Sequence, residues 1–78
     1  MKEKIEETII SLLEEYRERG LSEEKLMNYV VARLGTEKPV NLEDYQEARR
    51  NLEGRVKVEE VEFTWGGSSY KEERLFLK

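Results

Sequence analysis

Carboxylates are the most abundant reactive groups in this 78-residue chain, but the residues that usually work with them are missing. The sequence contains 18 Asp and Glu residues, no histidine and no cysteine. It therefore lacks the commonest general base, the thiolate nucleophile and the strongest protein ligands for transition metals. An acidic band in the C-terminal third matches no known Mg²⁺ or Ca²⁺ loop; it consists of Glu59, Glu60, Glu62, Glu72 and Glu73. We expect no enzyme activity, no metal and no cofactor.

The stretch FTWGGSSYK, residues 63–71, provides candidate binding residues of a different kind. It places Phe63, Trp65 and Tyr70 around two glycines and two serines. The glycines do not indicate a phosphate-binding loop, which needs a lysine and a following helix. Exposed aromatic rings anchor protein interfaces because they bury a large area at a small cost in entropy. If these three rings are exposed, they predict a surface for a protein partner or a second copy of the chain.

Three amphipathic helices are expected before this stretch. In residues 3–19, apolar side chains recur at spacings of three and four, and Gly20 then ends the helix in the left-handed conformation. Ser22 is expected to cap a second helix that runs to Gly35, and its wide apolar arc predicts the most enclosed of the three. Asn41 is expected to cap a third helix that closes at Gly54.

After Gly54 the apolar period changes from 3.6 to 2, which predicts a β-hairpin. If Gly66 and Gly67 form a two-residue turn, the opposite pairs are Phe63–Tyr70, Glu62–Lys71, Glu59–Arg74, Val58–Leu75 and an unfavourable Glu60–Glu73. This register places the three rings on the face opposite Val56, Val58, Leu75 and Leu77. A bulge at Glu59–Glu60 would instead return the rings to the core, and a four-residue turn would pair Trp65 with Tyr70. These alternatives decide whether the rings are exposed.

Three capped helices followed by a long hairpin resemble the winged-helix (winged helix-turn-helix) fold. The resemblance lies in the order of the elements over nearly the whole chain, not in a signature motif. It implies one α+β domain, residues 1–78, with residues 41–53 in the major groove of DNA and the hairpin beside the backbone. The segment GTEKPV, residues 35–40, is longer than the turn of about 3–4 residues in a strict helix-turn-helix.

The resemblance directs attention to the cations and amides of the third helix and the hairpin. Gln, Arg and Asn contact base edges, and Lys and Arg contact phosphates. The candidate nucleic-acid-binding residues are Gln46, Arg49, Arg50, Asn51, Arg55, Lys57 and Lys71. Against this role, the net charge is −4 and the third helix also carries several acidic residues, so phosphate would be repelled. The resemblance implies, as the first hypothesis, a DNA-binding or transcription-associated protein that uses the third helix and the hairpin. The alternative is a protein-interaction module or homodimer joined through the aromatic residues.

Size and composition set the remaining expectations. The chain is long enough for one domain, and it has no apolar run of the roughly 20 residues that would cross a bilayer. The absence of cysteine fits a cytoplasmic protein. Charged residues make up 41% of the chain, a content typical of thermophile surfaces.

Overall fold

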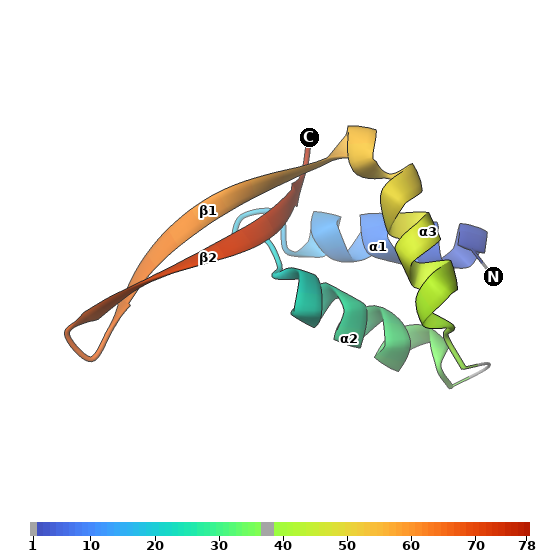
Figure 1. Ribbon diagram of the computed structural model, residues 1–78, viewed down its shortest axis with the longest axis horizontal. Helices are drawn as coiled ribbons and strands as arrows, with labels where there is room; N and C mark the ends of the chain where they lie inside the picture. Colours follow the sequence, from blue (N-terminus) through green and yellow to red (C-terminus); the bar gives the residue numbers. More distant parts are fainter. Residues whose placement is uncertain (1, 37–38) are drawn as a thin grey trace.

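The computed structural model describes residues 2–36 and 39–78 and shows three helices followed by a two-stranded hairpin (Figure 1). The helices are α1 (Lys2–Glu15), α2 (Glu23–Leu34) and α3 (Leu42–Asn51). A short 3₁₀ turn, η1 (Glu53–Arg55), leads from α3 into strands β1 (Val56–Trp65) and β2 (Ser68–Leu77). The predicted α+β class and the predicted order of elements are confirmed.

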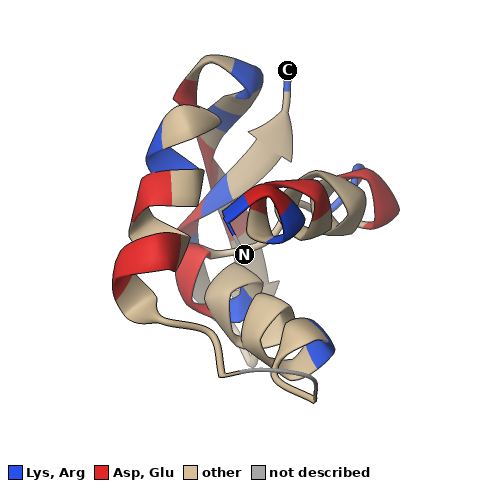
Figure 2. Cartoon of the chain, turned by 90° about the vertical axis from the view of Figure 1, so that its right-hand side faces the viewer, with Lys and Arg blue, Asp and Glu red and all other residues tan. Residues whose placement is uncertain are grey.

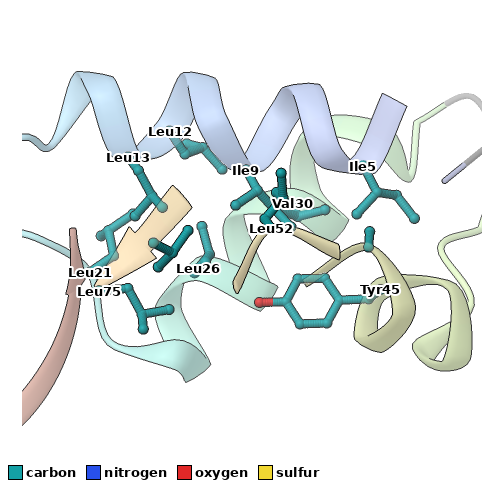
Figure 3. Packing of buried hydrophobic residues seen from close by; sticks show 12 residues of the cluster. Ile5, Ile9, Leu12, Leu13, Leu21, Leu26, Val30, Tyr45, Leu52 and Leu75 are labelled. Atoms are coloured by element: carbon teal, nitrogen blue, oxygen red, sulfur yellow. The ribbon is translucent and has the colours of Figure 1, made fainter. Parts of the chain in front are cut away.

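Helix α1 forms the centre of the core. Its buried apolar side chains are Ile5, Ile9, Leu12 and Leu13, whereas α2 buries only Leu26 and Val30 among its apolar residues. Figure 3 shows the core as a row along α1, from Ile5 near Tyr45 at one end to Leu13 near Leu21 and Leu75 at the other. The expectation that the second helix is the most enclosed is wrong. Helix α1 contacts α2, α3 and β2, and these three elements cover more of its surface than is covered on α2.

The helix starts follow the expected capping chemistry, but α1 and α3 end earlier than predicted. Helix α3 ends at Asn51, and Gly54, where it was expected to close, lies within the 3₁₀ turn η1. Ser22 and Asn41 each accept a hydrogen bond from a backbone N–H of the helix that follows. Helix α1 ends at Glu15, earlier than the apolar spacing predicts, and a turn over residues 16–19 leads to Gly20. Gly20 has the expected left-handed conformation, with φ of 70°.

The hairpin has the register of a two-residue turn. Gly66 and Gly67 have φ angles of 58° and 84°, and positive φ at both central residues is what a type I′ turn requires. The strands pair one-to-one over ten residues each, so there is no bulge at Glu59–Glu60. The observed opposite pairs include Phe63–Tyr70, Glu62–Lys71, Glu60–Glu73, Glu59–Arg74 and Val58–Leu75, as the two-glycine turn predicts.

Only the base of the hairpin packs on the helices. Val56 and Leu75 are buried in the core, and Leu77 packs against it. Leu21, between α1 and α2, exchanges two backbone hydrogen bonds with Leu75, at N–O distances of 3.2 and 2.7 Å. Leu21 thus adds a one-residue third strand to the outer edge of β2. This arrangement of three helices and a hairpin is compatible with a winged-helix-like domain.

The rest of the hairpin extends away from the helices as a two-stranded ribbon (Figure 1). We call residues 58–73 the arm. Nearly all of its side chains are exposed, and those of Val61 and Glu72 are half-buried. Strands of ten residues are longer than the usual 5–6, and a hairpin without a supporting layer is marginally stable in water. The arm must therefore be stabilised by contacts between its own side chains and by its attachment at the base.

Gly20 provides a test of that attachment. An alanine Cβ at this position would lie 2.6 Å from Cζ of Phe76, in a left-handed conformation that disfavours any side chain. We expect Gly20→Ala to lower the free energy of unfolding by about 2 kcal/mol, measured by urea denaturation. Gly54→Ala is the matched control, because nothing lies within 4 Å of its added methyl group. The free energy of unfolding of that variant should be unchanged or higher by up to about 1 kcal/mol. Equal decreases in the two variants would contradict the packing of Phe76 on Gly20.

Candidate partner-binding surface

The three aromatic residues predicted as partner contacts lie together near the end of the arm and are exposed. Phe63 is 39% exposed, Tyr70 46% and Trp65 76%. We call these three residues the aromatic tip. The alternative in which the rings return to the core is wrong, because the ladder has no bulge and this half of the hairpin lies beyond the helices.

Two of these rings stabilise the hairpin by packing on each other across the strands, and the third does not. Phe63 and Tyr70 are directly opposite each other, and their ring centres are 5.9 Å apart. Such a cross-strand aromatic pair stabilises a hairpin that has little else to hold it. Trp65 is opposite Ser68, and no other aromatic ring of the described residues packs against it. The largest ring of the chain therefore has no evident structural role within the chain.

Arg74 links the aromatic tip to the helical body. Its guanidinium group donates a 3.0 Å hydrogen bond to the carbonyl of Arg19 and two weaker ones to the carboxylate of Glu72. The guanidinium carbon also lies 5.4 Å from the centre of the Phe63 ring, on the same face of the hairpin. The two-residue turn places Arg74 opposite Glu59. The contacts of Arg74 with Arg19 and Phe63 could not be predicted from the sequence, because they depend on the reach of a long side chain along the strand.

Lys57 makes a similar set of contacts at the base of the hairpin. Its ammonium nitrogen lies 5.9 Å from the centre of the Phe76 ring and 3.3 Å from a carboxylate oxygen of Glu59. On this face of the hairpin, each of the two cations thus lies beside one aromatic ring and one carboxylate. The ring and the carboxylate act together because the π face and the carboxylate both attract positive charge.

The arm itself is strongly acidic. Residues 58–73 include five glutamates and one lysine. Lys71 makes its ion pair with Glu60, diagonally across the ladder at 3.7 Å, and not with Glu62 directly opposite. Within the described part of the chain, Glu62 and Glu73 have no ion-pair partner. The hairpin therefore has cations near its base, an acidic middle and an aromatic end.

The seven predicted nucleic-acid-binding residues do not form one basic surface. Three of them make ion pairs within the chain: Arg49 with Glu23, Lys57 with Glu59 and Lys71 with Glu60. Gln46, Arg49 and Arg50 line a shallow groove between α3 and β1, whereas Arg55 lines another groove together with glutamates of α1. Asn51 is exposed at the end of α3. Figure 2 shows acidic and basic segments following one another along α3.

Glu23 forms a polar contact that fixes α2 against α3. The Tyr45 hydroxyl donates to one carboxylate oxygen of Glu23 and the Arg49 Nε donates to the other, both at 3.2 Å. Burial of the phenol raises the pKa of Tyr45 well above its ordinary value, and the negative charge of Glu23 acts in the same direction. Arg49 is thus held in place by the protein and has a structural role.

Other functional sites find little support in the described residues. No group of three acidic side chains within residues 2–36 and 39–78 is placed to hold a metal ion. None of the helices in these ranges is long and apolar enough to cross a membrane. Comparison with known proteins gives no match either, whether to a family model, a curated protein or a solved structure.

The buried phenol predicts a loss of stability at high pH. Because the pKa of Tyr45 is higher in the folded chain than in the unfolded one, folding favours the neutral phenol. Its contribution is complete below the ordinary value of 10.0 and is lost as the pH rises above it. Relative to Tyr45→Phe, the wild type should lose about 1.4 kcal/mol per pH unit above that value, measured by urea denaturation from pH 8 to 11.5. Parallel profiles for the two proteins would contradict this assignment.

The contacts of Arg74 are expected to stabilise the arm against the helical body. We expect Arg74→Gln to lower the free energy of unfolding by about 1–2 kcal/mol, since its side chain is only 21% exposed and makes charged hydrogen bonds. Amide exchange in residues 60–71 should become faster. Lys71→Gln is the control, because its 3.7 Å pair with Glu60 is exposed and should contribute less than about 0.5 kcal/mol. Similar effects of the two variants would show that Arg74 does not anchor the arm.

Proposed function

We propose that this chain is a non-catalytic, winged-helix-like binding module that docks a protein partner through its aromatic tip. The observation that carries the proposal is Trp65, which is 76% exposed at the far end of the arm. A small domain needs its large apolar side chains in the core, so a tryptophan held in solvent requires another explanation. Tryptophan and tyrosine are also the residues that most often dominate binding energy at protein interfaces.

The shape of the hairpin supports a docking role. The Phe63–Tyr70 pair and the contact of Arg74 with Phe63 hold the neighbouring rings in place before any partner arrives. A preorganised surface binds more tightly because little conformational entropy is lost on association. The arm also projects from the body, so a partner can reach Trp65 without displacing any part of the helical core (Figure 1).

Duplex DNA is the alternative partner, and the charge distribution favours it less. Phosphate contacts supply much of the affinity of DNA-binding proteins. Here three of the seven candidate residues already neutralise carboxylates of the same chain. Helix α3 carries Glu43, Asp44 and Glu47, and the arm that would lie beside the DNA backbone is acidic. Arg50 and Arg55 remain the best candidates for contacts with phosphate.

The proposal predicts that Trp65 dominates partner binding. Selection from a library of random displayed peptides, with the whole protein as bait, should yield peptides that bind the wild type. Trp65→Ala should bind them at least tenfold more weakly, as expected when a central interface aromatic is lost. Its Tm should be unchanged, because the removed side chain is largely exposed. Fluorescence anisotropy of labelled peptides measures the affinities.

Val58→Ala is the matched control, since Val58 is another exposed apolar residue of β1, on the opposite face of the strand. It should bind the selected peptides as the wild type does. The docking proposal fails if no peptide is enriched or if Trp65→Ala retains full affinity. It also fails if the protein retards duplex DNA at low salt and Arg50→Ala weakens that complex while Trp65→Ala does not.

A further inference from the structure

On the face of the hairpin that carries the rings, two aromatic rings each have a cation beside them, but the ring at the end of the arm has none in the described part of the chain. Lys57 lies beside the Phe76 ring, and Arg74 lies beside the Phe63 ring. Each of these cations also contacts a carboxylate two residues away on its own strand, at 3.3 Å in both cases. Trp65 is the next ring along β1 on this face, and no cation of the described chain lies over it.

We propose that the partner docked by the aromatic tip presents arginine side chains, and that one guanidinium group stacks on Trp65. The inference rests on the proposed function and names the chemistry of the partner. Tryptophan is the aromatic side chain that binds cations most strongly, and a largely exposed ring offers its face freely. Arginine is favoured over lysine because its planar guanidinium stacks on rings and loses less hydration. The chain itself uses an arginine, Arg74, at the neighbouring ring.

The charge of the arm supports a basic partner. The arm contains five glutamates and one lysine, so its net charge is negative. Glu62 and Glu73 have no ion-pair partner among the described residues. A negative arm attracts a basic segment and increases the rate of association. The same charge repels nucleic acid, acidic peptides and the arm of a second copy. Glu62 and Glu73 lie on the face of the ribbon opposite the rings, so they act on a basic partner through the negative field of the arm and not by contact beside Trp65. Of the possible occupants, an arginine-containing segment of another protein is the one that suits both the exposed ring and this field.

The single tryptophan of the chain makes a direct test possible, because its emission reports on the aromatic tip alone. The probe is the blocked peptide Gly-Arg-Gly-Arg-Gly, titrated into the whole protein. The matched probe replaces each arginine with citrulline, which keeps the shape but removes the charge. We expect a saturable change in emission with the arginine peptide and at least fivefold weaker binding of the citrulline peptide. Lysine in place of arginine should give intermediate affinity.

Two further measurements separate stacking from simple charge attraction. The double variant Glu62→Gln, Glu73→Gln should bind the arginine peptide severalfold more weakly, whereas Glu24→Gln on α2 should not. Raising the salt concentration should weaken binding but should not abolish the preference for arginine over lysine, because stacking is screened less than the charge attraction. Equal affinity for the arginine and citrulline peptides would overturn the proposal, and so would equal affinity for arginine and lysine.

The outcomes also distinguish this inference from the docking function. If displayed peptides that lack arginine and lysine need Trp65 for binding, while the arginine peptide leaves its emission unchanged, the docking function stands and this inference fails. If neither kind of peptide binds, both fail. Light scattering of the protein alone should give the mass of a monomer; a concentration-dependent increase that Trp65→Ala abolishes would identify a second copy as the occupant and overturn the inference.

Discussion

The attachment of β2 to the segment between α1 and α2 is the contact on which the rest of the hairpin depends. Leu21 and Leu75 exchange backbone hydrogen bonds, and both side chains are buried in the core. A ribbon of two strands has too little apolar surface to be stable alone. The base of the hairpin is fixed by the backbone hydrogen bonds of Leu75 and by burial of the Val56 side chain. The rest of the two strands can therefore extend into solvent and keep its register.

The apolar residues of this small chain are divided between a buried core and an exposed arm. Nearly all of the buried apolar side chains come from the helices and the base of the hairpin, and α1 contributes the largest share. The arm is stabilised differently, by the Phe63–Tyr70 pair, by Arg74 and by the diagonal ion pair of Lys71 with Glu60. The exposed ion pair contributes little by itself, whereas the ring pair and the partly buried Arg74 hold the rings in place. Stability is concentrated in the body, and the arm presents side chains to solvent.

Electrostatics gives the two ends of the hairpin different properties. Cations gather near the base, where Arg74 and Lys57 contact rings, carboxylates and the chain of the helical body. Carboxylates predominate farther out, and the tip is uncharged and aromatic. A wing that lies beside a DNA backbone would be expected to show the opposite distribution, with cations toward its end. The chain combines a winged-helix-like order of elements with a hairpin whose outer part is acidic and aromatic.

The sequence by itself determined the class, the order of the elements, the caps and the turn. Helical and strand periods are local properties, and the two glycines specify a turn that sets the register of every pair, including Phe63 with Tyr70. The tertiary structure decided which helix is central, since burial of α1 depends on contacts with three other elements. It also decided that Trp65 is exposed, because its exposure depends on how far the ribbon extends beyond the helices. The partners of Arg74 and Lys71 likewise depend on side-chain reach in three dimensions, which no local pattern encodes.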